Sequence, residues 1–192
     1  TRCSRDWSSD VCSSDLDARA LLVGSSKAVW GPFVAWLRQS PVERLALANP
    51  FDTFVVETVE GALRAESVVP HAVLYPWQTD PDKLVAFQRL AHLTGMAVLD
   101  ENVHLCVHPE LGPWISLRAL VVLGEEEPLP GWTPPPLSRV TSADLIPAEE
   151  LQNAAALLAR AVDASSRNDP DAWTVWVAAR RAVSLGRAHE FG

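Results

Sequence analysis

Hydrophobic and polar residues alternate along residues 103–123 with the two-residue period of β-strands. In the first part of this run, Val103, Leu105 and Val107 share one face, while His104, Cys106 and His108 share the other. A Pro-Glu-Leu-Gly-Pro turn follows at 109–113, and residues 114–123 alternate again. The pattern predicts an antiparallel hairpin with one chemical surface, lined by His104, Cys106, His108, Trp114, Ser116 and Arg118.

Helical and extended patterns alternate over the rest of the chain. Extended patterns predict a buried first strand at 17–24 and an edge strand at 67–77, where Pro70 interrupts the start and Tyr75 and Trp77 share a face. Helical spacing predicts helices at 27–39, 50–62, 81–95 and 147–164, and a last helix from Asp169 that holds Arg180 and ends before Gly186. Asn49 is the expected N-cap of the second helix. The fold class expected is α+β, with a mainly antiparallel central sheet flanked by helices.

Composition narrows the class of protein. The chain has 192 residues, of which 48% are hydrophobic, and this suits one domain at 17–192 with one substantial core. A formal net charge of −8 argues against a nucleic-acid partner. Because no apolar run approaches the roughly 20 residues of a membrane span, and no signal-peptide pattern opens the chain, we expect no membrane partner and a cytoplasmic location. The sequence leaves the oligomeric state open.

Two segments lack the period of a helix or strand. Residues 1–16 form a polar near-repeat, Ser-Ser-Asp-Val-Cys-Ser-Ser-Asp-Leu at its centre, which we interpret as a non-native or disordered tail derived from a sequencing adapter. Setting this tail aside removes Cys3 and Cys12 and leaves Cys106 as the one native thiol, which excludes a disulfide framework and a four-thiolate metal cluster. The acidic, proline-rich stretch at 124–137 is expected to cross the surface in extended form.

The segment from Cys106 to Arg118, Cys-Val-His-Pro-Glu-Leu-Gly-Pro-Trp-Ile-Ser-Leu-Arg, resembles the C-[IV]-H-P-x-[FY]-G-G-W-F-x-[IL]-R segment of the CblC-type cobalamin-processing proteins, the MMACHC family. The Asn-Pro-Phe-Asp helix start at 49–52 and the Ala-His-Leu-Thr-Gly helix end at 91–95 are similar to that family and occur in its order. The chain departs from the better-known relatives between Met96 and His104, where a longer Tyr- and Gln-rich insertion is missing. It resembles a fragment of the family domain, truncated at both ends.

The resemblance implies a nitroreductase-like fold that binds cobalamin with its lower base detached and removes the upper ligand by reduction or by transfer to glutathione. Carried over to this sequence, it implies corrinoid contacts from one set of residues: His92, Cys106, His108, Pro109, Gly112, Trp114 and Ser116. It implies glutathione contacts from Arg118 and Arg180. FMN or FAD is a further cofactor that the resemblance allows, no catalytic residue is assigned, and the missing insertion leaves the removal of cyanide in question.

The residues themselves support simpler interpretations beside these. His104, Cys106 and His108 cannot together bind one metal ion, because residues four apart on a strand are separated by about 13 Å, and no metal site is expected. Cys106 reads as a small buried hydrophobe rather than a nucleophile. Arg118 lies in an otherwise apolar strand and therefore needs an anion, which is either an internal Asp or Glu or a bound ligand.

Three classes of function remain open. The first is a cobalamin-processing enzyme. The second is a flavin-dependent reductase of the same fold, for which Lys27 is the one candidate cation for the flavin phosphate. The third is a non-catalytic corrinoid-binding module, favoured if the shortened 97–103 segment has removed the reaction machinery.

Overall fold

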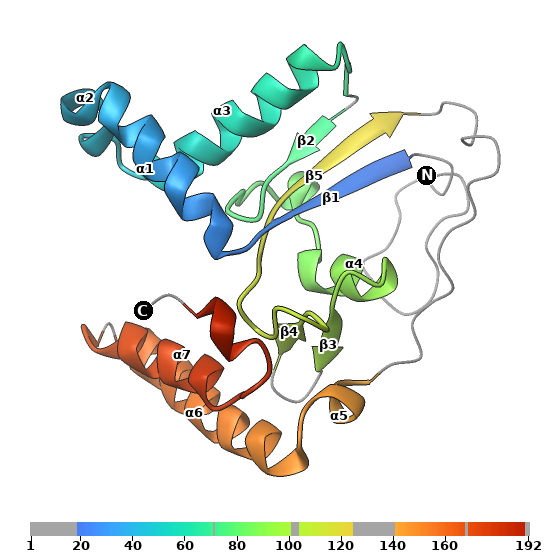
Figure 1. Ribbon diagram of the computed structural model, residues 1–192, viewed down its shortest axis with the longest axis vertical. Helices are drawn as coiled ribbons and strands as arrows, with labels where there is room; N and C mark the ends of the chain where they lie inside the picture. Colours follow the sequence, from blue (N-terminus) through green and yellow to red (C-terminus); the bar gives the residue numbers. More distant parts are fainter. Residues whose placement is uncertain (1–18, 71, 101–103, 125–140, 168, 191–192) are drawn as a thin grey trace.

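The computed structural model describes residues 19–70, 72–100, 104–124, 141–167 and 169–190. Figure 1 shows a strand layer in the N-terminal half, with helices on both sides of it, and a pair of long helices at the C-terminal end. The predicted tail at 1–16 lies outside the described residues, and so does the predicted crossing from 125 to 137.

Two small antiparallel sheets account for the strands in the described part of the chain. In the first sheet β5 (Ser116–Gly124) is central, and β1 (Arg19–Ser25) and β2 (Ala72–Leu74) pair with its two edges. In the second sheet β3 (Val98–Asp100) pairs with β4 (Leu105–Val107). Antiparallel sheets combined with helices confirm the α+β class.

The expected helices occur in the predicted order. The bounds of the helices are Lys27–Val29 (η2, a 3₁₀ turn), Trp30–Gln39 (α1), Pro41–Leu45 (α2), Pro50–Ala65 (α3), Pro81–Lys83 (η3), Phe87–Leu93 (α4), Ser142–Leu145 (α5), Ala148–Ser166 (α6), Ala172–Arg181 (α7) and Arg187–His189 (η4). Of these, α2, α5 and η4 occur in addition to the expected helices. The helices expected at 27–39, 50–62 and 147–164 are confirmed, and so is the last helix. The helix expected at 81–95 is wrong in its first half, because regular α-helix begins only at Phe87.

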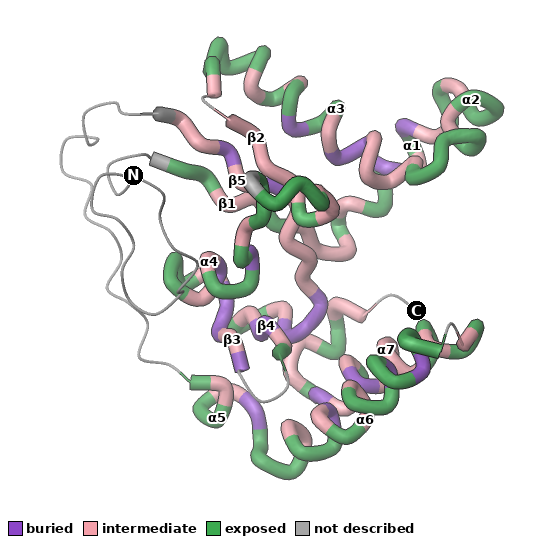
Figure 2. Tube along the Cα trace, turned by 180° about the vertical axis from the view of Figure 1, so that it is seen from behind, coloured by how far each residue is buried: buried purple, intermediate pink, exposed green. Residues whose placement is uncertain are grey.

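Three apolar clusters hold these elements together. The largest packs α1 and α3 against one face of the central strand, where Ala119 and Val121 are fully or almost fully buried. A second joins α4 to β3, β4 and the other face of β5 through Ala91 and Cys106. The third packs β4 onto the C-terminal helices through Val107. Figure 2 shows that buried residues lie where these elements meet, and that α6 and α7 are exposed along their outer sides.

The predicted hairpin at 104–123 is wrong. Its two strands belong to different sheets, because β4 pairs with β3 while β5 pairs with β1 and β2. His104, expected on the first strand, instead lies in a turn with a left-handed φ of 50°. The turn itself is tight, since the backbones of His108 and Gly112 exchange two hydrogen bonds of 2.9 Å. The chain then leaves this turn toward the larger sheet instead of folding back on β4.

Three further expectations need correction. The first strand was expected to be buried, but it is an edge strand and the side chain of Leu21 is 53% exposed. Asn49 precedes α3 as expected, but its side chain makes no capping hydrogen bond; its carbonyl instead accepts from the amide and the hydroxyl of Thr53. The edge strand expected at 67–77 is shorter than predicted: β2 ends at Leu74, so Tyr75 and Trp77 follow the strand and do not share a face of it, although their rings stack with centres 4.9 Å apart.

Two glycines join the 108–114 turn to the segment that follows α7. Gly112 and Gly186 both have left-handed backbones, with φ of 59° and 72°. A Cβ atom on Gly112 would overlap the carbonyl of Leu185, and one on Gly186 would overlap the carbonyl of Leu111. Only glycine allows both the backbone conformation and the close approach. This glycine contact fixes the turn against the C-terminal helices.

Replacing Gly112 with alanine is therefore expected to destabilise the protein by about 3 kcal/mol or more, because the left-handed backbone and the overlap with Leu185 each add a cost. Gly61 is the matched control. It lies inside α3 with no atom within 4 Å of the added Cβ, so Gly61→Ala should stabilise by about 0.5–1 kcal/mol. Denaturant unfolding of both variants measures the difference; equal effects would contradict the glycine contact.

Candidate functional site

Arg118 is held at the point where α3 begins. Its Nε donates a hydrogen bond of 2.9 Å to Oγ of Ser25, and its guanidinium lies 4.5 Å from the centre of the Phe51 ring. The register between β1 and β5 shifts here, so that Val23 pairs with Ala119 and Gly24 pairs with Leu117. Arg118 lies at this shift of register, between the two paired residues Leu117 and Ala119, and has no partner on β1. It was expected on the face opposite Ala119 and Val121, but it contacts Phe51, which packs in the same cluster as those two residues.

Arg180 completes a pair of cations with Arg118. Burial lowers the pKa of the Arg118 guanidinium, Asp52 partly restores it, and the charge of Arg180 lowers it again. Burial likewise lowers the pKa of Arg180. Among the described residues no carboxylate lies within ion-pair distance of either guanidinium. An internal salt bridge for Arg118, the simpler interpretation of the sequence, is therefore absent from the described part of the chain.

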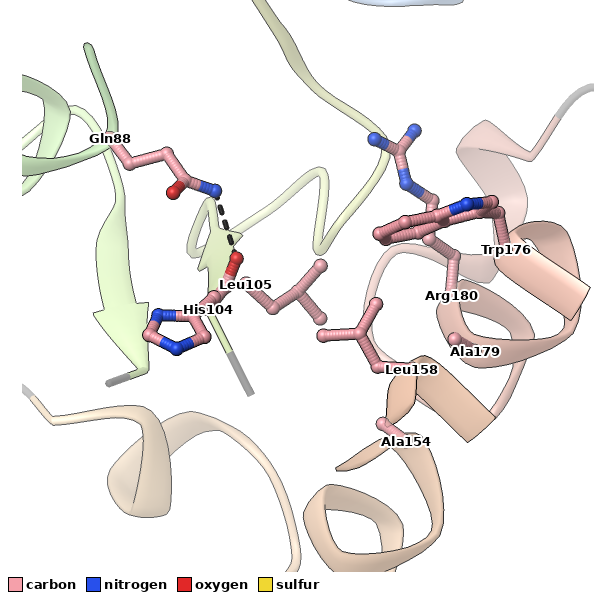
Figure 3. Close-up of a pocket in the computed structure, with 8 residues that line it drawn as sticks. All are labelled: Gln88, His104, Leu105, Ala154, Leu158, Trp176, Ala179 and Arg180. Atoms are coloured by element: carbon pink, nitrogen blue, oxygen red, sulfur yellow. Dashed lines mark hydrogen bonds between the residues drawn. The ribbon is translucent and has the colours of Figure 1, made fainter. Parts of the chain in front are cut away.

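Arg180 also lines a small cavity between α4, β4 and the C-terminal helices (Figure 3). The cavity has a volume of about 100 Å³. Gln88 closes one side and donates a hydrogen bond of 2.8 Å to the carbonyl of His104, while the indole of Trp176 lies beside Arg180 on the other. The remaining lining is apolar and is formed by Leu105, Ala154, Leu158 and Ala179.

A larger cavity of about 280 Å³ lies at the end of β1. Its walls are mostly apolar, and three polar side chains interrupt them: Ser25, Ser26 and His108. The other lining residues are Gly24, Met96, Leu111, Ile115 and Leu117. Ser25 is shared between this cavity and Arg118, so the cavity and the arginine pair are adjacent parts of one region.

The other residues predicted to contact a corrinoid are distributed around this region. His92 is half-buried, and its Nδ1 accepts a hydrogen bond of 3.3 Å from the amide of Leu99. Pro109 is exposed, Ser116 pairs with Ser25 at the start of β5, and Gly112 makes the glycine contact. None of these lines either cavity.

Cys106 and Trp114 lie in the interior instead. Cys106 packs between α4 and the second sheet, and burial raises the pKa of its thiol to about 11. Trp114 is only 7% exposed, and its indole N–H has no hydrogen-bond partner among the described residues. A buried donor without a partner is costly. The surface predicted for the 104–118 segment is therefore not continuous: His108 lines a cavity, whereas Cys106 and Trp114 are buried in the interior.

Sequence reasoning missed the residues that complete both cavities. Ser25 and Ser26 follow the first strand directly, and two consecutive hydroxyls at a strand end were the available signal. Gln88 and Trp176 lie on helices where nothing in the pattern distinguishes them from ordinary surface positions.

Within the part of the chain that the structure describes, no cluster of three or more His, Cys, Asp or Glu residues could hold a metal ion, and no helix is both long and apolar enough to cross a bilayer.

Comparisons with known proteins support a relation at the level of the fold. No protein-family model matches the chain, and no curated protein does. Among solved structures, the fold is similar to the crystal structure of a B12-trafficking protein CblC from C. elegans, described as a human MMACHC homologue. The TM-score is 0.54 at 13% sequence identity, and the match covers 88% of this chain and 80% of that one. At this identity the likeness shows the fold.

The raised pKa of Cys106 predicts slow alkylation. At pH 8 a thiol with a pKa of about 11 is ionised to only about one part in a thousand, and the thiolate is the reactive form. Iodoacetamide should therefore modify the Cys106 peptide much more slowly in the native protein than in urea, as measured by mass spectrometry. Equal labelling rates in the two states would contradict the raised pKa.

The same shift affects stability. Because the raised pKa favours the protonated thiol in the folded state, the contribution of Cys106 to the free energy of unfolding is present below the unfolded pKa and is lost as pH rises toward 11.

Proposed function

We propose that this protein binds cobalamin with its lower base detached and removes an alkyl group from the upper face by transfer to glutathione. The observation that carries the proposal is the pair of half-buried arginines, Arg118 and Arg180, which have no carboxylate within ion-pair distance among the described residues. The fold shared with a B12-trafficking CblC supports the choice of a corrinoid as the other ligand.

Two cations near each other, neither in an ion pair with a described carboxylate, favour the binding of an anion. Each guanidinium loses solvation on burial and repels the other, and a ligand carboxylate offsets both costs. Glutathione brings two carboxylates, and planar guanidiniums bind such groups through paired hydrogen bonds. The same positive field favours the thiolate over the thiol.

That thiolate is the nucleophile in the proposed reaction. Its sulfur attacks the alkyl carbon on cobalt, a sulfur–carbon bond forms, the cobalt–carbon bond breaks, and the electron pair stays on the cobalt. The protein's contribution is to hold the tripeptide and the corrinoid in the geometry of attack. No residue of this chain needs to serve as the nucleophile, which suits the raised pKa of Cys106.

The volumes of the two cavities limit how a corrinoid can bind. Both are smaller than the roughly 300–1,000 Å³ of pockets that enclose drug-sized ligands. The macrocycle would therefore lie over the mouth of the larger cavity, with a peripheral group inside it and His108 beside it. Trp114 offers an unpartnered N–H close in sequence to this surface, but its burial keeps it from the ligand in this conformation.

The flavin-dependent reductase is the weaker alternative. It requires a cation for the flavin phosphate, and Lys27 was its candidate. The Nζ of Lys27 instead donates to the carbonyl of Ala188, which ties η2 to η4. No described feature favours a flavin over a corrinoid. The non-catalytic module remains a testable outcome, since it would bind cobalamin without turnover.

Corrinoid binding is expected to change the visible spectrum of methylcobalamin to that of the base-off form when purified protein is added in excess. Detachment of the lower base alters the axial field at cobalt, so the long-wavelength band should shift toward the blue. Absorbance titration measures the shift and the affinity. An unchanged spectrum in the presence of folded protein would contradict the proposed base-off binding of cobalamin.

Changing Arg118 to Gln should weaken the use of glutathione while leaving corrinoid binding in place. The loss of one charge-assisted contact is expected to cost about 1.5–3 kcal/mol, or roughly ten- to a hundredfold in kcat/KM for glutathione. Arg180→Gln should act in the same direction. Thiol-dependent dealkylation of methylcobalamin, followed by absorbance, measures both variants.

Arg64→Gln is the matched control, because Arg64 is exposed on α3 and pairs only with Glu60 at 3.4 Å. It should leave glutathione use unchanged. Arg118→Gln should cost only about 1–2 kcal/mol of stability, from the Ser25 hydrogen bond and the Phe51 contact. A strongly destabilised Arg118→Gln protein with normal glutathione dependence would show that the arginine is structural.

A further inference from the structure

The larger cavity presents hydrogen-bond donors from all three of its polar side chains. The first is His108. Its Nδ1 accepts hydrogen bonds from the backbone amides of Glu110 and Leu111, at 3.1 Å and 3.2 Å. Because Nδ1 is an acceptor, the neutral ring carries its proton on Nε2. In this arrangement the ring offers a ligand its Nε2–H as a hydrogen-bond donor.

The second and third donors are hydroxyls. Oγ of Ser25 accepts from Nε of Arg118, and Oγ of Ser26 accepts from the amide of Ala28 at 3.3 Å. Each oxygen thus has one lone pair in use, while no described acceptor takes its proton. Both hydroxyl protons are available to the cavity that these residues line. The bond from the charged Arg118 also polarises the Ser25 hydroxyl and strengthens it as a donor.

The surroundings agree with this donor character. The other side chains in the lining are apolar, so they cannot accept from these groups, and no carboxylate belongs to the lining. The arginine pair next to Ser25 makes the local potential positive. This positive potential disfavours a cationic ligand group such as an ammonium, while a carbonyl oxygen on an apolar frame can accept from all three polar side chains.

We propose that the larger cavity, lined by Ser25, Ser26 and His108, is a subsite for a carbonyl oxygen, and that it takes a peripheral amide arm of the corrin ring. The inference rests on the proposed corrinoid function and adds the contact that orients the ring. A phosphate oxygen of the nucleotide loop and a carbonyl of glutathione share the acceptor chemistry, and the experiment distinguishes them from the amide.

Two variants remove donors, and Ser25→Ala also removes the acceptor of the Arg118 Nε–H. Ser25→Ala deletes the hydroxyl, and Ser25→Thr restores it. His108→Asn keeps an oxygen near the place of Nδ1, where it can still accept from the amides of the turn, but has no group at the place of Nε2. His108→Asn also leaves Arg118 untouched. Ser166→Ala, at an exposed position at the end of α6, is the matched control.

The probes are methylcobalamin and dicyanocobinamide, which carries the corrin amides but lacks the nucleotide base and its ribose phosphate. Ser25→Ala and His108→Asn should each weaken both probes by about three- to tenfold. Ser25→Thr should bind like the wild type, and so should Ser166→Ala. The double variant should depart from the product of the two single losses, because both donors act on one oxygen and their contributions are therefore coupled.

Three results would overturn the assignment while leaving corrinoid binding intact. The variants could bind both probes like the wild type. They could lose affinity for methylcobalamin alone, which would assign the donors to the phosphate. They could raise only the KM for glutathione, which would assign them to the thiol. A wild-type protein that binds neither probe would instead contradict the proposed function, and the subsite with it.

Discussion

The contact between Gly112 and Gly186 is the constraint on which the candidate site depends. It brings the turn after β4 against the segment after α7 with no side chain between the two backbones, and both glycines have left-handed φ values. Through it, the turn that holds His108 and the helix that holds Arg180 are fixed relative to each other. The hydrogen bond from Lys27 to Ala188 then ties the same C-terminal segment to η2, close in sequence to Ser25. One close approach of backbone thus positions residues from three distant parts of the sequence.

Holding the Arg118 and Arg180 guanidiniums near each other is electrostatically unfavourable, and the packing of the surrounding elements keeps them there. Arg118 is stabilised by the Ser25 hydroxyl, by the face of the Phe51 ring and by the charge of Asp52 in the first turn of α3. These contacts orient the guanidinium, but none of them is an ion pair. Arg180 is half-buried near it and adds repulsion. A protein that needed only stability would gain from replacing such a pair with apolar residues, so its presence beside two cavities favours a role in binding an anion.

The sequence predicts the long helices because each carries an amphipathic period and clear end signals, such as Pro50 as the first residue of α3. It also predicts that Arg118 and Arg180 come together, although only through a family resemblance. The strand pairing could not be predicted, because β3 has three residues and too short a period to detect, and alternation along β4 and β5 is compatible with pairing to any neighbour. The position of Arg118 was wrong for a local reason, the shift of register beside Gly24, which moves its side chain to the α1 and α3 face. The cavities depend on contacts between distant residues, which no period encodes.

The most direct test of the account is a crystal structure of the protein with S-methylglutathione, the thioether product, and cob(II)alamin, which stands in for the cob(I)alamin that the transfer would leave. The account predicts the corrin over the larger cavity, with the lower base detached and an amide oxygen near Ser25 and His108. It also predicts the carboxylates of the tripeptide on Arg118 and Arg180. A structure in which both guanidiniums pair with carboxylates of the protein itself, and the corrin lies elsewhere, would contradict it.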